Sequence, residues 1–427
     1  MRAAFYECDV TPPLGGFMWG HYHEVLASDV KDRLYVKAVV TEDAGKYAAI
    51  ISVDTCSLIP GIHEIVTKRI AQYTPIPAES VCITSNHSHS GAPISSDPSC
   101  GGKADEPYLD VFLRLCADSV ILAYKRLDDV NVSFARGTVE GIAFNRNFVV
   151  DDGRLVTHRW SSKNIVSPLD ETDPDLPVLF FERDGKQIGA IVNFSCHQCC
   201  LPKYNSYSGD YSSYISKHLK EKYGQDFVSL FVLAPCGDIN HVGPDYAEKA
   251  HTDWYQTMGK LIADTVIEIK ATAQPVSGSV AAIKEQIDIP RRPVDDKTVL
   301  KKAGEMLVAG QSSMRARNLL FYQRTHNGVQ SDLLPVQAIV IGDVLISVLP
   351  GEVYNAFGRE IKERSPYSRN MVIENANEYC GYIPTAKAFS EKSDLYEISL
   401  CHHSRHIPEA GDMLKEKVLS LANELHG

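Results

Sequence analysis

The sequence predicts an α/β protein in which mixed β-sheets with hairpins are flanked by helices. Short apolar runs of β-type residues alternate with stretches of helical periodicity along the whole chain. Two pairs of β-rich runs are each joined by a tight turn, which is typical of antiparallel strands. Purely parallel sheets have no hairpins, so a mixed sheet is expected. No internal repeat or long linker divides the chain, and we expect residues 1–427 to form a single domain.

The first third of the chain is predicted to supply three strands and two helices. β-rich runs at 35–40 and 47–53 flank the turn at 42–45, and a further apolar run covers 81–84. Apolar residues recur at helical spacing between 62 and 70. Pro107 stands where a second helix begins, a position that proline favours.

The rest of the chain supplies the two hairpins and further helices. One hairpin covers 177–194 and turns at Asp184-Gly185, and the other covers 336–349 and turns at Gly342-Asp343. Helical patterns follow Gly209 and cover 254–269, 295–323 and 408–425.

Charge and hydropathy exclude some classes of protein. The chain has 427 residues, with 43 Lys and Arg against 54 Asp and Glu, and therefore a net charge of −11. An acidic balance argues against a general nucleic-acid binder, which needs a basic surface. The sequence has no apolar run of the roughly 18–20 residues that a transmembrane segment requires. The first residues show no export signal, so a cytoplasmic location is expected.

The 11 cysteines are an odd number, which suits reduced thiols in a cytoplasmic protein. Cys196, Cys199 and Cys200 surround His197 and leave a cysteine-rich zinc site open as an alternative.

Signatures of dinucleotide and phosphate loops, of HExxH metalloproteases and of GxSxG hydrolases are all missing from the sequence. Instead, polar residues follow apolar strands. His87 and His89 come directly after the run at 81–84, and in extended backbone they would point to the same face. Such a pair can share a metal, or one histidine can bind while the other transfers protons. The acid of a His-x-His-x-Asp hydrolase is absent, and a barrel amidohydrolase would carry the pair on its first strand.

Four further motifs have this form. His197 follows the first hairpin, Asp238 lies in the turn PCGD, and Glu352 follows Pro350-Gly351 at the expected start of a helix. Tyr379 and Tyr382 follow another short strand. Each has an ordinary structural explanation when taken alone: a core histidine, a turn carboxylate, a helix-terminal glutamate or half-buried tyrosines.

Together these motifs resemble one family. The order NHSHSG, NFxxH, GD, PGE and NxYxxY is similar to that of neutral (alkaline) ceramidases, zinc-dependent amidases that release a fatty acid from ceramide. Similar segments are ECDVTPP near the start, RLYVKAVV from Arg33, SVD at Asp54, FNR at Arg146 and SGDY at Asp210. The resemblance runs from about residue 3 to residue 400 and implies a neutral-ceramidase-like catalytic domain.

The resemblance also implies a Zn²⁺ cofactor and a set of site residues. The metal ligands would be His87, His197, Glu352 and Tyr382. Two nitrogens, a carboxylate and a phenol suit zinc and can leave a position open for water. The residues around the reaction centre would be His89, Arg146, Asp238 and Tyr396. Asp238 would be the general base, while Arg146, Tyr396 and His89 would stabilise the oxyanion.

Two departures from the family bear on mechanism and substrate. The family's GDVSPN segment reads GDINHV here, so Asn240 replaces its serine and a serine-nucleophile mechanism is excluded. We also expect no C-terminal immunoglobulin-like domain and no export signal, which argues against membrane ceramide as substrate.

Two features bear on the substrate pocket. We assign Asn240 to substrate binding, together with Trp19 on the predicted loop GGFMWGHYHE. Phe17, Met18 and Tyr22 of that loop would either wall the same pocket or cover the core.

The sequence therefore predicts a zinc-dependent hydrolase of an N-acyl (amide) bond. The substrate would be a small-molecule or lipid-like N-acyl compound. Two alternatives stay open: an ester or lactone hydrolase with the same zinc centre, and a non-catalytic binding protein that retains the pocket. The sequence leaves the oligomeric state open.

Overall fold

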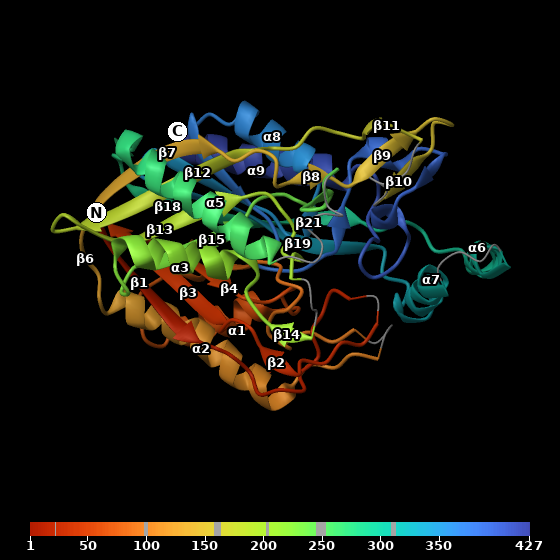
Figure 1. Ribbon diagram of the computed structural model, residues 1–427, viewed down its shortest axis with the longest axis horizontal. Coiled ribbons are helices and arrows are strands. Elements are labelled where there is room, and N and C mark those ends of the chain that lie inside the picture. The colour runs from red at the N-terminus through yellow and green to blue at the C-terminus, as the bar shows by residue number, and fades with distance from the viewer. Residues whose placement is uncertain (22, 98–100, 158–163, 202–204, 245–252, 309–312) are drawn as a thin grey trace.

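The computed structural model describes residues 1–21, 23–97, 101–157, 164–201, 205–244, 253–308 and 313–427 (Figure 1). Tyr22 of the predicted loop lies outside this part of the chain. Three larger sheets form the centre of the molecule, and helices cover their outer faces. The predicted mixed α/β class is confirmed.

The first sheet has the strand order β5-β4-β3-β1-β6. β1, β3 and β4 are antiparallel neighbours, and β5 lies parallel to β4 because α1 connects them. The strands are β1 (Arg2–Asp9), β3 (Tyr35–Asp43), β4 (Lys46–Val53), β5 (Val81–Ser85) and β6 (Asp128–Asp129).

The second sheet has the order β15-β13-β12-β7-β17. The predicted hairpin around Asp184-Gly185 forms its centre, and β15 lies parallel to β13. The strands are β7 (Asn131–Thr138), β12 (Asp175–Arg183), β13 (Lys186–Phe194), β15 (Val228–Leu233) and β17 (Gln274–Pro275).

The third sheet has the order β18-β19-β20-β22. The second predicted hairpin forms β19 and β20, and β22 lies parallel to β20. The strands are β18 (Val280–Pro290), β19 (Ser331–Ile341), β20 (Val344–Val348) and β22 (Arg369–Ile373).

The three sheets share one central core, and this explains why their strands read as continuous apolar runs. Along β3, Val39 points into the central cluster, whereas its neighbours Ala38 and Val40 pack on the opposite face. β12 and β19 alternate in the same way, with Leu179 and Ile339 among the central side chains. Both faces of each sheet are therefore buried, and hydrophobic burial holds the three sheets together.

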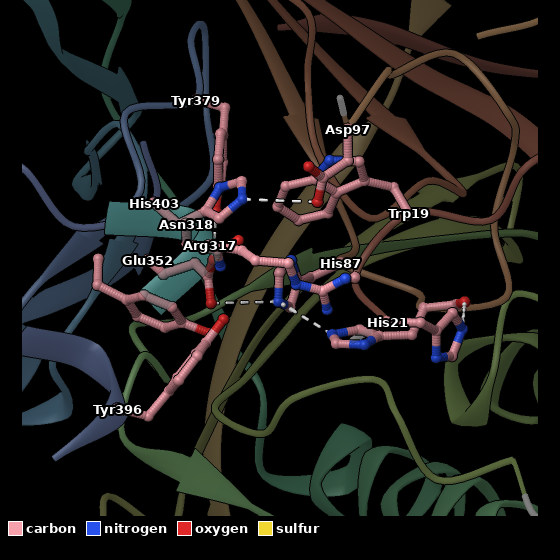
Figure 2. Close-up of a pocket in the computed structure, with 13 residues that line it drawn as sticks. Trp19, His21, His87, Asp97, Arg317, Asn318, Glu352, Tyr379, Tyr396 and His403 are labelled. Atoms are coloured by element: carbon pink, nitrogen blue, oxygen red, sulfur yellow. Dashed lines mark hydrogen bonds and ion pairs between the residues drawn. The ribbon is translucent and has the colours of Figure 1, made fainter. Parts of the chain in front are cut away.

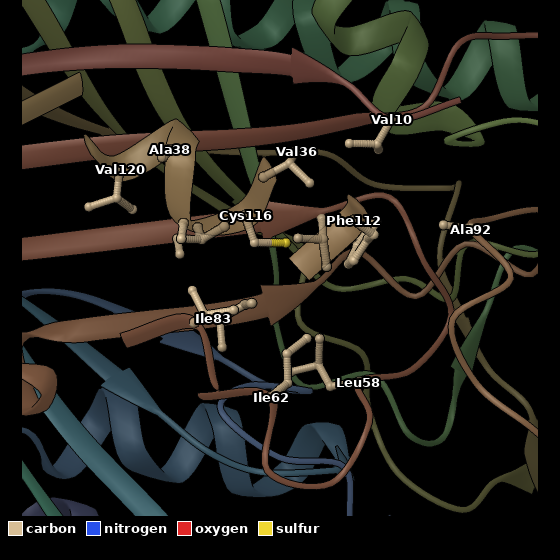
Figure 3. Close-up of a cluster of buried hydrophobic side chains, with 14 of the residues drawn as sticks. Val10, Val36, Ala38, Leu58, Ile62, Ile83, Ala92, Phe112, Cys116 and Val120 are labelled. Atoms are coloured by element: carbon tan, nitrogen blue, oxygen red, sulfur yellow. The ribbon is translucent and has the colours of Figure 1, made fainter. Parts of the chain in front are cut away.

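Helices cover the outer faces of the sheets. α1 and α2 pack on the first sheet, α3 and α5 on the second, and α8 and α9 on the third. Figure 3 shows Phe112, Cys116 and Val120 of α2 facing Val36 and Ala38 of β3. The bounds are α1 (Ile62–Ile70), α2 (Glu106–Tyr124), α3 (Tyr211–Tyr223), α5 (Trp254–Ile269), α8 (Asn355–Arg364) and α9 (Ala410–His426). Short 3-10 turns are η1 (Ala78–Ser80), η2 (Lys270–Thr272), η3 (Ala386–Phe389) and η4 (Tyr396–Ile398).

The single helical stretch expected over 295–323 is instead two helices, α6 (Asp296–Val308) and α7 (Ser313–Thr325). They pack against each other through a small apolar cluster and extend at one end of the molecule (Figure 1). Helical periodicity alone does not reveal where a chain reverses between two antiparallel helices.

The remaining strands form smaller sheets. One four-stranded sheet contains β11 (Ile165–Pro168), β9 (Asn147–Val150), β10 (Leu155–Thr157) and β24 (Ser393–Asp394). Two-stranded pairs join β2 (Asp29–Val30) with β14 (Ser206–Tyr207), β8 (Phe144–Asn145) with β16 (Ile239–Asn240), and β21 (Glu352–Val353) with β23 (Tyr382–Ile383). Of the helices in the described ranges, none combines the length and apolar composition needed to cross a bilayer.

Candidate metal centre

Each of the three sheets delivers one side chain to a common point. His87 follows β5 of the first sheet, and His197 follows β13 of the second. Glu352 lies four residues beyond β20 of the third sheet, in the short strand β21. All three side chains are about 99% buried. The carboxyl ends of three buried strands thus converge, and the predicted meeting of these residues is present in the structure.

The ligand atoms of the three residues lie within 4.8 Å of one another. Nε2 of His87 is 3.4 Å from Oε2 of Glu352, and Nε2 of His197 is 3.2 Å from the same oxygen. A tetrahedral metal bound at about 2.0–2.1 Å separates neighbouring ligand atoms by about 3.3 Å. The observed spacing fits a metal ion bound among the three atoms.

Backbone contacts fix which ring nitrogens face this point. Nδ1 of His87 lies 2.7 Å from the carbonyl oxygen of Cys56. Nδ1 of His197 lies 2.8 Å from the carbonyl oxygen of Cys236. A carbonyl oxygen only accepts hydrogen bonds, so each Nδ1 carries a proton and each Nε2 presents a lone pair. This is the arrangement that metal-binding histidines adopt.

The chemistry of these atoms also indicates a cation. Oε2 of Glu352 is buried and has no hydrogen-bond partner, although two imidazole nitrogens surround it. Burial alone would raise the pKa of Glu352, yet His87 and His197 hold it well below its usual range. Burial and the Arg146 guanidinium lower the pKa of His197 to about 4, so it is neutral at physiological pH. Two imidazole nitrogens and a carboxylate oxygen at this spacing are ligand types that zinc binds, and the residues therefore fit a metal ion.

The local backbone differs from the predicted one at two of these residues. His87 does not lie in extended backbone but has a φ of 64°, in the left-handed region. A histidine holds this sparsely populated conformation only when its surroundings enforce it, and such strain is common at functional sites. Glu352 lies in β21 rather than at the start of a helix, since α8 begins at Asn355. Favourable interaction with a helix dipole therefore does not explain this carboxylate.

Three tyrosines surround the carboxylate. Tyr382 is the parallel-strand partner of Glu352 in the β21–β23 pair. Tyr379 donates a hydrogen bond of 2.7 Å from its hydroxyl to Oε1 of Glu352. Tyr396 packs edge-on against Tyr382, with ring centroids 5.7 Å apart. Tyr382 thus lies beside the three ligand atoms, and its role as fourth ligand stays a prediction.

His89 and Arg146 contact the centre from opposite sides. Nε2 of His89 lies 3.4 Å from Nε2 of His87. Burial and the neighbouring histidines lower the pKa of His89 well below its usual value. The Arg146 guanidinium lies 3.4 Å from Nε2 of His197 and forms a buried ion pair of 2.6 Å with Glu397. His89 lines the cavity at this centre, whereas Arg146 is buried behind it and contacts the centre through His197.

Asp238 and Asn240 are buried among scaffold groups instead. Oδ2 of Asp238 accepts a hydrogen bond from the Asn145 amide, and Oδ1 accepts one from the backbone N–H of Asn355. Burial raises the pKa of Asp238 to about 6. The Asn240 amide lies 3.5 Å from Sγ of Cys199. Neither residue is among the described residues that line the cavity at the centre, and the predicted roles of both stay predictions.

A narrow cavity of about 40 Å³ leads to two of the three residues, His87 and Glu352 (Figure 2). Trp19 lines it, with its ring packed edge-on against Tyr379 and His403. Met18, its neighbour on the predicted loop, is fully buried in the core beneath the first sheet. The loop therefore both covers the core and walls the cavity. The described lining residues are Trp19, Gly20, His21, His87, His89, Asp97, Arg317, Asn318, Glu352, Tyr379, Tyr382, Tyr396 and His403.

The alternative zinc site among the cysteines is not formed in the described part of the chain. Cys196, Cys199 and Cys200 are free thiols. They make no three-residue ligand set with His197 there, whose Nε2 faces Glu352 instead. A second set of close ligand atoms does contain a cysteine, Cys56 with His87 and His89, and it shares His87 with the first set.

Several contributors, or their roles, were not expected from the sequence. Glu397, which pairs with Arg146, lies in a segment of ordinary composition. Tyr379 belongs to the predicted tyrosine motif, but its hydrogen bond to Glu352 was not predicted. One signal was available for Glu397: a guanidinium expected in a buried site requires a carboxylate partner nearby. Arg317 and His403 reach the cavity from segments for which the sequence suggested no function.

Comparison with known proteins places this geometry in a family. The profile described as neutral/alkaline non-lysosomal ceramidase, N-terminal, matches residues 7–253, more than half of the chain. The crystal structure of neutral ceramidase from Pseudomonas aeruginosa matches with a TM-score of 0.76 at 19% identity, over 99% of this chain and 74% of that one. A structure described as ceramidase complexed with C2 matches with a TM-score of 0.74 at 16% identity, over 100% of this chain and 75% of that one. A search of curated proteins finds no match. The predicted resemblance is confirmed: the chain belongs to the neutral/alkaline non-lysosomal ceramidase family.

Proposed function

We propose that this protein is a zinc-dependent hydrolase that cleaves an N-acyl (amide) bond. The observation that carries the proposal is the unpartnered Oε2 of Glu352, which faces Nε2 of His87 and Nε2 of His197 at ligand spacing. Membership in a ceramidase family supports an amide substrate. Nitrogen and carboxylate ligands suit zinc among the common metals, and Tyr382 completes the proposed set of four.

A bound zinc ion would supply Lewis-acid polarisation of a carbonyl and would lower the pKa of a water molecule. The side chains of this protein provide the remaining functions. Glu352 and the two histidines fix the position of the ion, and Tyr379 holds the carboxylate by its hydrogen bond to Oε1. Arg146 places a permanent positive charge beside the centre, because its pKa lies well above its usual value: Glu397 and Tyr382 outweigh the effect of burial. With Tyr396, it would stabilise negative charge that develops on the substrate oxygen.

The proton acceptor is assigned on geometry. His89 lines the cavity and lies within 3.4 Å of a ligand nitrogen, so it can contact a water molecule at the centre. Asp238 was the base expected from the sequence, but both of its oxygens accept hydrogen bonds from scaffold groups. We therefore propose His89 as the acceptor and Asp238 as a residue that positions Arg146, whose backbone N–H donates to the Asp238 carbonyl oxygen.

The substrate is proposed to be a soluble amide, and ceramide is expected to react slowly. In the described ranges no helix could anchor the protein in a bilayer, and the chain carries a net charge of −11. Anionic membrane surfaces attract basic segments instead. An ester or lactone hydrolase is the second candidate, since the first chemical step at such a centre is the same.

Metal analysis combined with a substrate panel tests the proposal. Purified protein should contain about one zinc per chain and should hydrolyse N-acyl substrates in a reaction that a chelator abolishes and zinc restores. Amides, esters and lactones with the same acyl group separate the two hydrolase candidates. Zinc-free protein that binds an acyl compound without turnover would instead identify a non-catalytic binding protein and refute the proposal.

A further inference from the structure

A second, larger cavity adjoins the one that leads to the centre. Its volume is about 580 Å³, and it shares Trp19, Asn318, Tyr379 and His403 with the smaller cavity. A substrate whose scissile bond lies at the metal ligands would extend into this space. The composition of the larger cavity therefore indicates which substituent the substrate carries.

One wall of the two cavities is a single face of α7. Arg317, Asn318, Phe321 and Thr325 line them, and their spacing places them on one side of the helix. α7 is held in this position by contacts with the segment that follows β24. Arg315 pairs with Asp394 at 2.6 Å, and the Thr325 hydroxyl lies 2.6 Å from Nε2 of His402.

Arg317 extends from α7 into the cavity beside the ligands (Figure 2). Its side chain is exposed, and no carboxylate in the described part of the chain forms an ion pair with it. A guanidinium presents donors in a planar fork that matches a carboxylate or phosphate. An arginine without an acidic partner at the entrance to a reaction centre is therefore available to bind a substrate anion.

Two further arginines line the larger cavity and share one acid. Arg291 contacts Asp332 through Nε and Nη2, at 2.8 and 2.5 Å, and Arg405 contacts the same carboxylate at 2.9 Å. His406 also lies 2.8 Å from it. Asp332 and the nearby Glu378, which interacts with Arg405, offset the charge of these two guanidinium groups.

Few acids line the two cavities. Among the described residues that line them, the carboxylates are Glu352, which belongs to the metal centre, and Asp97. Asp97 lies 3.7 Å from Nε2 of His403. Asp332 pairs with Arg291 and Arg405, so Arg317 is the arginine of the lining with which no carboxylate in the described ranges forms an ion pair.

From this arrangement we infer that the substrate is an anionic amide: an N-acyl compound with a carboxylate or similar anionic group that Arg317 binds. This inference rests on the proposed amide hydrolysis and names its substrate class. A neutral substrate such as ceramide would leave Arg317 without a partner.

A pair of matched substrates tests the inference. One is an N-acyl amino acid with a free carboxylate, and the other is the same compound as its neutral carboxamide. Because hydrogen bonds to charged groups are the stronger ones, kcat/KM of the full-length zinc enzyme should be about 10- to 100-fold higher for the carboxylate. In Arg317→Gln this ratio should fall to within about threefold of unity. An N-acyl alkyl phosphate in place of the carboxylate shows which anion is preferred.

Arg324→Gln is the matched control, since it removes the same charge from the same helix but does not line either cavity. The control should keep the wild-type ratio. Equal rates for the two substrates in the wild type, or an equal loss of the ratio in both variants, would overturn the inference while leaving amide hydrolysis intact.

A binding measurement separates this outcome from failure of the proposed function. The probes are ketone analogues in which CH₂ replaces the amide N–H, one with a carboxylate and one with a carboxamide. Calorimetry should show about tenfold or tighter binding of the carboxylate to wild type, and no preference in Arg317→Gln. A preference without any amide turnover would support the anion site and refute the hydrolase. Equal binding of both probes would refute the anion site.

Discussion

Glu352→Gln separates the effect of the metal from the effect of the fold. In the metal-free protein, Glu352 is a buried carboxylate whose pKa is held well below its usual range by His87 and His197. A glutamine can keep its oxygen at the Tyr379 hydroxyl, but it carries no charge. The substitution therefore removes a charge that the two histidines stabilise, and it should destabilise the metal-free protein.

The magnitude follows from the contacts. A buried hydrogen bond or contact to a charged group contributes about 1.5–3 kcal/mol, so metal-free Glu352→Gln should be less stable than wild type by about that amount. Zinc widens the difference. At a zinc concentration of 100 times its dissociation constant, wild type gains about 2.7 kcal/mol. The variant lacks the negative ligand and should gain less than about 1 kcal/mol at the same concentration.

Urea unfolding with chelator and with zinc measures both quantities, and elemental analysis gives the zinc content directly. Glu378→Gln is the control, because it makes the same chemical change one residue before Tyr379 without touching the ligand atoms. Equal stabilisation of wild type and Glu352→Gln by zinc would refute the proposed centre. A metal-free Glu352→Gln protein that is more stable than wild type would refute the argument about the carboxylate and its two histidines.

Three other predictions follow from the same structure. His89→Gln should retain zinc and lose about 10²–10⁴-fold in kcat, the range for removal of a general base. Asp238→Asn should chiefly lower the free energy of unfolding. A normal rate in His89→Gln would return the base role to Asp238. Burial raises the pKa of Asp210 to about 6, above its unfolded value of about 3.9, so ionisation between pH 4 and 6 should cost the native state up to about 3 kcal/mol. In urea titrations, wild type should therefore lose stability relative to Asp210→Asn as the pH rises through this window. The same pH dependence of stability in both proteins would contradict this prediction. Phe181→Ala, which empties the fully buried position beside Phe5, should destabilise by about 3–5 kcal/mol, and a much smaller loss in urea unfolding would show that the central cluster is loosely packed.

The sequence predicts local elements of this fold well, and the arrangement of the sheets poorly. The helix at 254–269 and the hairpin around Asp184-Gly185 are present because periodicity and turn residues are local properties. The three sheets around one core were not predicted. Residues of β3 are apolar on both faces, and such a pattern does not say which sheets pack against them. That information lies in contacts between residues far apart in the sequence.

The candidate site shows the same division. His87, His197 and Glu352 were assigned through their order along the chain, and the structure brings them together. Glu397 was missed because its role depends on Arg146, a tertiary neighbour. Tyr379 was singled out together with Tyr382, but its hydrogen bond to Glu352 was not predicted, since nothing in its own segment marks that partner.

The delivery of one ligand from each sheet has a consequence for folding order. His87 and His197 lie within the segment that matches the family profile, whereas Glu352 lies 99 residues beyond its end. Contacts between such distant residues form late, since the intervening chain must first be closed into loops. The ligand set is therefore complete only after the third sheet has docked on the other two. Zinc uptake during refolding would report that final docking step, and a chain released before Glu352 is synthesised would hold only two of these ligands.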